Sequence, residues 1–213
     1  MIKRIRNYFI IGMSSVFSGK VFAIASGFYI GAMGGTATNQ ATPQNAQLGN
    51  NSTVIVKPKS TQYGARGFVG YKFNSYTGME AGVTYFSAIQ YSGSAAACTS
   101  PQSRIVGGDV VGVGTLPIGN FGVFAKAGVA IINIFTSGAF YTPAPGNTCA
   151  GSQNNLRYRG TASIGASYDF NQTWVADISA NRIMVAGIIG NVDFYALGIS
   201  YHFVDLYCGQ FLC

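Results

Sequence analysis

The strongest constraint on this chain is the alternation of side chains between residues 194 and 203. Every second residue is large and apolar, and the residues between are mostly small or polar. Successive side chains of a β-strand point to opposite faces, so this stretch predicts a strand with one apolar and one mostly polar face. The apolar face consists of Tyr195, Leu197, Ile199, Tyr201 and Phe203.

Charged residues are too few to cover a water-soluble protein built from such strands. Only 9% of the 213 residues are charged, 13 basic and 6 acidic, whereas ordinary soluble domains carry about 25%. No run of 18 or more apolar residues occurs, which argues against a membrane-spanning helix. A chain that is apolar enough for lipid but lacks such a helix predicts a transmembrane β-barrel, whose strands satisfy one another's backbone hydrogen bonds.

Alternation of this kind recurs often enough to build a small barrel. Eight segments show it, at residues 27–38, 63–73, 78–91, 105–116, 121–133, 157–170, 174–181 and 194–203. The fourth leaves its inner face open, because Asp109 shares a face with Val111 and Val113, and it allows a β-bulge. The expected fold is therefore all-β, an eight-stranded antiparallel up-and-down transmembrane β-barrel, and an even strand number suits bacterial barrels.

The connections between these segments alternate in length. Short ones lie at residues 74–77, 117–120 and 171–173, whereas long ones fall between the other consecutive segments. Outer-membrane barrels have short periplasmic turns and long outer loops, so the alternation predicts that topology and a bacterial outer-membrane location. Residues 39–51, 92–103 and 142–155 are polar, and residues 54–56 (VIV) are expected to extend a strand above the membrane.

The N-terminus predicts export. Lys3, Arg4 and Arg6 precede an apolar run at residues 8–17, and residues 23–25 (AIA) offer a cleavage site, so residues 1–25 are expected to be a signal peptide. The alternative is a retained amphipathic helix. Residues 26–203 then form the barrel and residues 204–213 a tail. Cleavage lowers the net charge from +7 to +3, by removing four basic residues, which argues against nucleic acid as a partner.

Charged residues on the polar strand faces are expected to pair inside the barrel. An eight-stranded barrel has room only for its own side chains, so these charges cannot line an open pore. Glu80 and Asp177 are the expected partners of Lys126 and Arg66. A polar core that fixes the barrel is favoured over a gate for ions. The full interior set is Arg66, Lys72, Glu80, Lys126, Arg157, Arg159, Asp169 and Asp177, with Arg182 as a further candidate.

Catalytic, metal and cofactor sites are not expected. The single histidine, His202, falls on the inward face near the periplasmic end, where a lipid-modifying enzyme would not place it. Aromatic residues gather at the short turns and predict a periplasmic girdle, namely Trp174, Tyr201, Phe203, Tyr168 and Phe170.

The four cysteines fall on opposite sides of the predicted membrane. Cys98 and Cys149 lie in outer loops, whereas Cys208 and Cys213 lie in the tail. Disulfides can therefore join Cys98 to Cys149 and Cys208 to Cys213, and four free thiols are the alternative.

Several short motifs resemble the OmpA-like eight-stranded outer-membrane barrels and related surface antigens. They lie at residues 27–31 (GFYIG), 70–73 (GYKF), 78–85 (GMEAGVTY), 116–119 (LPIG), 124–128 (FAKAG) and 201–203 (YHF). The resemblance covers residues 27–203. The peptidoglycan-binding domain of that family does not follow, so its wall-anchoring role is not expected. Phe203 is the expected recognition signal for the barrel assembly machinery, although a tail follows it.

The sequence thus predicts a monomeric, non-enzymatic barrel with a structural or surface-interaction role, like an adhesin or surface antigen. Outer-membrane lipid and lipopolysaccharide are expected to surround it, and a host or other cell-surface ligand would bind its loops. The alternatives are a narrow porin-like channel and, less favoured, an outer-membrane lipid-modifying enzyme.

Overall fold

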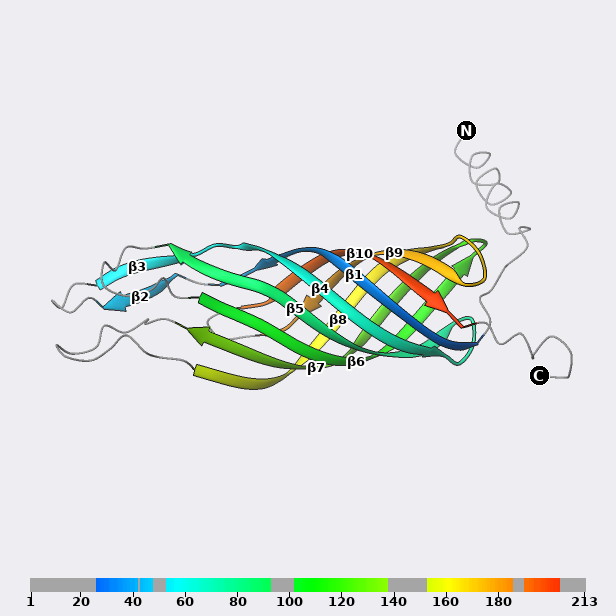
Figure 1. The fold of residues 1–213 in the computed structure, drawn as a ribbon, viewed down its shortest axis with the longest axis horizontal. Coiled ribbons are helices and arrows are strands. Elements are labelled where there is room, and N and C mark those ends of the chain that lie inside the picture. The colour runs from blue at the N-terminus through cyan, green and yellow to red at the C-terminus, as the bar shows by residue number, and fades with distance from the viewer. Residues whose placement is uncertain are drawn as a thin grey trace, which may run out of the picture.

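The computed structural model describes residues 26–41, 43–47, 53–92, 102–137, 153–185 and 190–203. No helix in these residues is long and apolar enough to cross a membrane. The expected signal peptide, the tail and all four cysteines lie outside them. The described residues form the strands β1 (Gly27–Asn39), β2 (Gln44–Gln47), β3 (Thr53–Pro58), β4 (Thr61–Lys72), β5 (Thr77–Ser92), β6 (Gln102–Ile118), β7 (Phe121–Ser137), β8 (Gln153–Asp169), β9 (Trp174–Ile183) and β10 (Val192–His202) (Figure 1).

Eight of these strands close into a barrel. The order is β5, β4, β1, β10, β9, β8, β7 and β6, and pairing of β6 with β5 completes the ring. Every pairing is antiparallel, and the first strand of the barrel, β1, pairs with the last, β10. The predicted eight-stranded up-and-down barrel is confirmed, and each predicted segment coincides with one barrel strand to within a few residues.

The remaining two strands, β2 and β3, extend beyond the ring on the side of the long connections (Figure 1). They pair with each other, and β3 also reaches the end of β5, where Lys57 lies opposite Ser92 and Pro58 opposite Tyr91. The expected strand at residues 54–56 is confirmed as part of β3.

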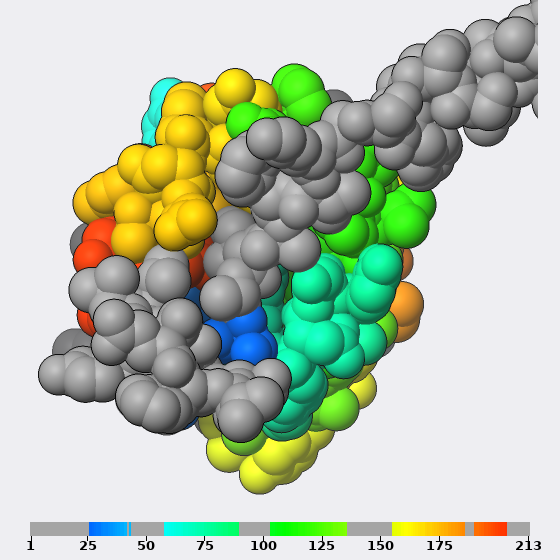
Figure 2. Space-filling model, turned by 90° about the vertical axis from the view of Figure 1, so that its right-hand side faces the viewer, coloured from blue at the N-terminus to red at the C-terminus, as the bar shows by residue number. Residues whose placement is uncertain are grey.

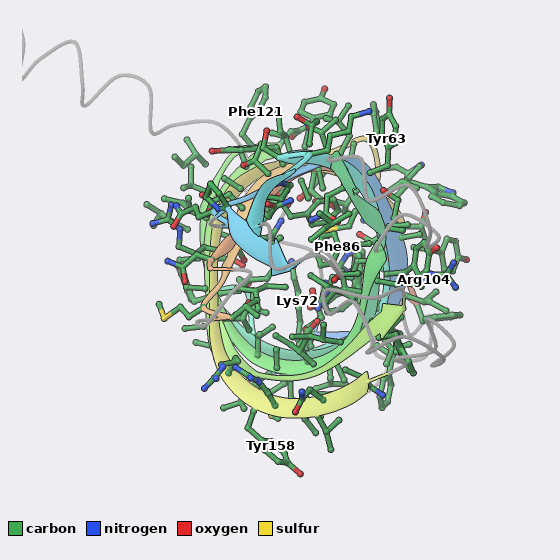
Figure 3. All side chains as sticks on the ribbon, turned by 90° about the vertical axis from the view of Figure 1, so that its left-hand side faces the viewer. Tyr63, Lys72, Phe86, Arg104, Phe121 and Tyr158 are labelled. Carbon is green, nitrogen blue, oxygen red and sulfur yellow. The ribbon has the colours of Figure 1, made fainter. Side chains whose placement is uncertain are left out.

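Side chains alternate between the lumen and the outer wall, as Figure 3 shows for the inward Phe86 and Lys72 and the outward Phe121 and Tyr158. Exposed large apolar side chains cover the outer wall on all eight strands. The sequence alone did not show which face of β6 points inward. In the structure the inward face carries Asp109. The register of β5 with β6 shifts between Phe86 and Ile89, so the irregularity lies on β5 and not within the fourth segment, where the sequence allowed a bulge.

Asparagine side chains close two of the three short turns, which gather at one end of the barrel (Figure 2). Asn74 Oδ1 accepts hydrogen bonds from the backbone amides of Tyr76 and Thr77, each at 2.8 Å. Asn171 Oδ1 accepts from those of Thr173 and Trp174, at 2.9 and 2.7 Å. An asparagine oxygen that binds amides two and three residues ahead mimics a backbone turn, so these residues fix where the strands reverse.

The third short turn is tighter than predicted. β6 continues through Pro117 and Ile118, and Ile118 lies opposite Phe121, so only Gly119 and Asn120 connect the two strands. Gly119 has a φ of 65°, a left-handed conformation that glycine adopts without steric cost.

Aromatic side chains surround the end of the barrel with the short turns. Trp174 contacts Tyr201 at 5.1 Å between ring centroids, and Tyr201 contacts Phe203 at the same distance. Tyr168 contacts Phe170 at 5.2 Å, edge to face. These rings are the residues of the predicted periplasmic girdle, and in the structure they lie on the outer wall beside the turns.

Candidate functional site: the filled lumen and the outer rim

Four charged side chains meet in the middle of the lumen. Arg66 on β4 contacts Glu80 on β5 (Nη1 to Oε1, 2.6 Å) and Asp109 on β6 (Nη2 to Oδ1, 2.6 Å; Nε to Oδ2, 3.0 Å). Lys126 on β7 contacts Glu80 Oε2 at 2.8 Å. Tyr29 donates its hydroxyl to the same oxygen at 3.2 Å. This charge network, Arg66, Glu80, Asp109 and Lys126, has two positive and two negative groups and crosses four consecutive strands.

Gly82 on β5 makes room for the long reach of Arg66. Its backbone lies between Arg66 on β4 and Asp109 on β6, and Gly82 is the register partner of Asp109. A Cβ atom at Gly82 would lie 2.6 Å from Arg66 Nη2 and 2.7 Å from its Cζ. The guanidinium group therefore rests on the backbone of β5 and reaches the strand beyond.

The expected pairing of Asp177 in the central network is wrong. Its Oδ1 atom is buried without a hydrogen-bond partner among the described residues, and its carboxylate lies against Gly198. Asp109 takes the expected place, because Gly82 opens a path from Arg66 to β6. The sequence could not show which of these two acidic residues binds Arg66, because the inward face of β6 could not be assigned from its pattern.

The other predicted interior charges face the lumen but lie outside the network. Lys72 and Asp169 point into the lumen from the ends of β4 and β8 beside the short turns. They form no ion pair with each other in the described residues. Arg157 and Arg159 both lie on the inward face at the outer end of β8. Arg159 Nε donates a hydrogen bond to the Val185 carbonyl at 2.7 Å. The predicted interior charges are therefore spread along the lumen. Within the predicted set, only Arg66, Glu80 and Lys126 form ion pairs in the described residues.

Arg182 faces outward rather than into the lumen. It lies on the same face of β9 as Trp174, Ile178 and Ala180, and it makes a two-pronged contact with Asp193 of β10. The two distances are 2.6 Å from Nε and 2.8 Å from Nη2. Its candidacy for the interior is wrong because its position in the strand has the phase of the outer wall.

An aromatic layer lies on the periplasmic side of the charge network. The rings of Tyr29 and His202 stack at 4.8 Å, and Phe68 meets Tyr29 edge to face at 6.2 Å. His202 is buried and lies 3.3 Å from the Ser200 hydroxyl. The histidine thus faces inward, as the sequence predicts, and packs in the core.

An apolar layer fills the lumen on the outer side of the network. Phe86 and Phe194 pack edge to face at 5.4 Å. Five aliphatic side chains from β5, β6, β7, β10 and the end of β9 join them, each less than 2% exposed. We call this layer the apolar plug, and its members are Phe86, Ile89, Ile105, Ile132, Val185, Val192 and Phe194.

A small cavity lies beside the charge network and touches Phe194 of the plug. Its volume is about 20 Å³, and Arg66, Asp109, Lys126, Asn181 and Phe194 are among its lining residues. A cavity of that size holds about one water molecule. The three layers and this cavity leave a lumen packed with protein atoms at its centre.

Positive charge dominates the outer half of the barrel. Within the described residues this half carries one acidic residue, Asp193, which pairs with Arg182. The guanidinium of Arg104 lies 5.9 Å from the ring of Tyr85 on the outer wall. The basic residues of this half are Lys57, Lys59, Arg104, Arg157, Arg159 and Arg182. The outer rim is thus basic. In the middle of the lumen, by contrast, Glu80 and Asp109 balance the charges of Arg66 and Lys126.

A closed barrel with an apolar outer wall, an aromatic girdle and a polar, charge-paired core defines an outer-membrane β-barrel protein. The chain matches the family described as Outer membrane protein beta-barrel domain over residues 9–203 and belongs to it. The protein is thus located in the bacterial outer membrane. It is also 28% identical to an uncharacterized protein of Coxiella burnetii, over 84% of this chain and 86% of that protein.

Solved outer-membrane barrels share the fold at low sequence identity. Neisserial surface protein A superposes with a TM-score of 0.59 at 10% identity, covering 84% of this chain and 98% of that one. OprG from Pseudomonas aeruginosa gives 0.53 at 11% identity, with coverage of 85% and 98%. The N-terminal barrel domain of OprF from the same organism gives 0.50 at 11% identity, with coverage of 84% and 99%. These similarities concern the fold alone.

Proposed function

We propose that this protein is a membrane anchor that presents an extended outer rim for interaction with a partner at the cell surface. The observation that carries the proposal is the length of the strands, which exceeds the height of the apolar band of a membrane barrel. β6, β7 and β8 each have 17 residues, and the hairpin of β2 and β3 extends further on the same side (Figure 1).

A strand of 17 residues is longer than a membrane requires. At about 3.3 Å per residue it measures about 56 Å, and a tilt near 40° gives a height of about 43 Å. The apolar band of such barrels is about 25 Å tall. Since the aromatic girdle fixes the lower edge of that band at the short turns, the surplus of about 18 Å lies on the outer side.

The packing of the lumen supports presentation at the surface over conduction. Ions would have to pass the aromatic layer, the charge network and the plug, in which Phe86 and Phe194 are about 1% exposed. Water is excluded from such a closely packed layer. We likewise propose no enzymatic role, because the single histidine, His202, is buried in the lumen away from lipid and from the outer rim.

Replacing residues 41–60 by a short turn tests the proposal. The change removes β2 and β3 but leaves every strand of the closed ring. The intact chain and the shortened chain would be expressed in a bacterial strain without adhesins of its own, and attachment to an epithelial cell layer would be counted. We expect the intact chain to raise attachment and the shortened chain to lose most of that gain.

A matched control alters the opposite end. Replacing residues 74–76 by another turn of equal length leaves the outer rim intact, so attachment should not change. Equal surface amounts of each folded barrel are checked by the mobility of unheated protein on gels. Attachment that is the same with and without the intact protein would contradict the proposal.

A further inference from the structure

The outer wall carries an apolar groove across four neighbouring strands, β8, β9, β10 and β1. Its volume is about 560 Å³. The outward residues that line it are Gly34, Thr36, Ile164, Ala166, Ile178, Ala180, Tyr195 and Leu197. The groove is thus a concave part of the surface that faces lipid, and it is separate from the lumen.

Small residues opposite large ones explain the groove. Ala180 lies between Tyr195 of β10 and Ile164 of β8 in the strand register. Gly34 lies opposite Leu197 in the same way. Tyr195 and Leu197 are 55% and 67% exposed and stand above these small neighbours, so the wall is hollowed between them.

The outer end of the groove meets a charged pair. Arg182 follows Ala180 by two residues on the same face of β9, and Asp193 precedes Tyr195 by two on β10. Arg182 is 53% exposed at its side chain, whereas Asp193 is 17% exposed. Asp193 engages Nε and Nη2 of Arg182, and Nη1 makes no hydrogen bond within the described part of the chain. The pair thus presents a guanidinium edge to the outside.

We infer that this groove binds one acyl chain of a phosphorylated lipid of the outer leaflet, with the lipid phosphate at Arg182. The apolar lining suits a hydrocarbon chain, and the exposed guanidinium at its outer end suits a phosphate, which arginine binds through its planar donors. The basic outer half of the barrel adds attraction for anionic head groups. The inference concerns the outer wall and does not depend on the proposed surface-interaction role.

The position of the groove along the barrel agrees with such a lipid. Ile164 and Ala166 lie a few residues from the turn at 171–173, whereas Thr36 lies nine residues from the start of β1. The groove therefore rises from the membrane interior toward the outer boundary, where Arg182 lies. A chain that enters from the outer leaflet would follow that direction with its head group outside.

Native mass spectrometry of the refolded barrel tests this inference. The protein would be placed in phosphatidylcholine nanodiscs that contain either lipid A or dephosphorylated lipid A, released in mild detergent, and the lipids that remain bound counted. We expect one bound lipid A for each wild-type barrel and weaker retention of the dephosphorylated form. Excess inorganic phosphate should not displace the lipid, because it has no acyl chain.

Two variants fill the groove. Ala180→Phe adds a large side chain between Tyr195 and Ile164, and we expect about tenfold weaker lipid binding, which corresponds to about 1.4 kcal/mol. Gly34→Phe should act in the same direction, since a Cβ atom there has no contact closer than 3.9 Å. The matched control is Ala125→Phe, in the same register row but on β7 and outside the groove, which should leave retention unchanged.

Two further variants test the phosphate contact. Arg182→Gln should reduce binding of lipid A about fivefold, as expected for one arginine near an anionic surface, and should leave the dephosphorylated lipid unaffected. Asp193→Asn removes the competing carboxylate and should keep or raise the binding of lipid A. If Arg182 serves only the ion pair, neither variant changes binding, and the phosphate contact is overturned.

Other outcomes would overturn the inference as a whole. Retention of lipid A that Ala180→Phe and Gly34→Phe leave unchanged would place the lipid elsewhere. Equal losses in Ala125→Phe would indicate general coverage of the wall by lipid. A dimer that both groove variants disrupt would instead make a second copy of the chain the occupant.

Discussion

Inward glycines and large inward side chains fit together at the scale of single residues. Phe68 occupies the space beside Gly31, Tyr29 the space beside Gly70, and Arg66 the space beside Gly82. In a narrow barrel each large side chain needs a gap on a neighbouring strand, because all inward positions share one small volume. The glycines thus decide where each charge can reach, and therefore which acid it meets.

Two buried carboxylates should respond differently when they are neutralised. Glu80→Gln removes the shared partner of Arg66 and Lys126 and leaves buried positive charge without compensation, so we expect a loss of about 3 to 5 kcal/mol in the free energy of unfolding. Asp177→Asn removes a charge that has no ion-pair partner among the described residues, so its cost should not exceed about 1 kcal/mol. Urea unfolding in lipid vesicles measures both, and equal losses would contradict the assignment of the network.

Glycine substitutions test the path of Arg66. Gly82→Val introduces side-chain atoms where the guanidinium group lies, so it should break the contact with Asp109 and cost about 1 to 3 kcal/mol. Gly67→Val is the matched control, because Gly67 faces outward on β4 and a Cβ atom there would meet nothing within 4 Å. A control variant as unstable as Gly82→Val would show that the strand and not the network is sensitive.

At the scale of secondary-structure elements, each barrel strand has one face toward lipid and the other toward the packed side chains of the lumen. Ile164 of β8 is 62% exposed on the outer wall, some six residues from the lower turn. Ile164→Arg should therefore cost about 2 to 4 kcal/mol, as a basic residue does at the midplane of a barrel. Met184→Arg, on the same wall just beyond the outer end of β9, should cost about 0 to 1 kcal/mol. Unfolding of both in vesicles checks the depth assignment, and a reversed order of costs would contradict it.

The sequence predicted the strands well because alternation is a local property. Tyr195 to Phe203 alternate without a break, and the structure places their large residues outward as expected. The predicted turn at residues 117–120 was two residues too long, since strand pairing includes Pro117 and Ile118 although proline lacks an amide hydrogen. The signal of β2 was too weak to find, because its four residues pair only with β3 beyond the barrel.

The interior site was harder to predict because it depends on contacts between strands. The pairing of Glu80 with Arg66 and Lys126 follows from their inward phase and opposite charge. The partner Asp109 was missed, since β6 is rich in valine and glycine on both faces and its phase could not be read. The choice between Asp109 and Asp177 depends on the space that Gly82 leaves for Arg66 and Gly198 leaves for Asp177. The alternation of side chains does not reveal such space.

At the scale of the whole molecule, the barrel divides into a lower membrane anchor and an upper basic rim. The anchor is closed by the aromatic layer, the charge network and the apolar plug, which cross the lumen between the two openings. The rim is formed by the outer ends of strands that are longer than the membrane needs. Because packed side chains close the lumen, the outer surface is the part of the barrel that can meet a partner.

Single-channel recording from the pure, refolded monomer in a planar bilayer tests this central claim most directly. With Phe86, Phe194 and the charge network in place, we expect no steady unitary current, because no continuous column of water crosses the packed centre of the lumen. A steady unitary current from the wild-type chain, whose amplitude or ion selectivity changes in Glu80→Gln, would contradict the account and identify the lumen as a conducting path.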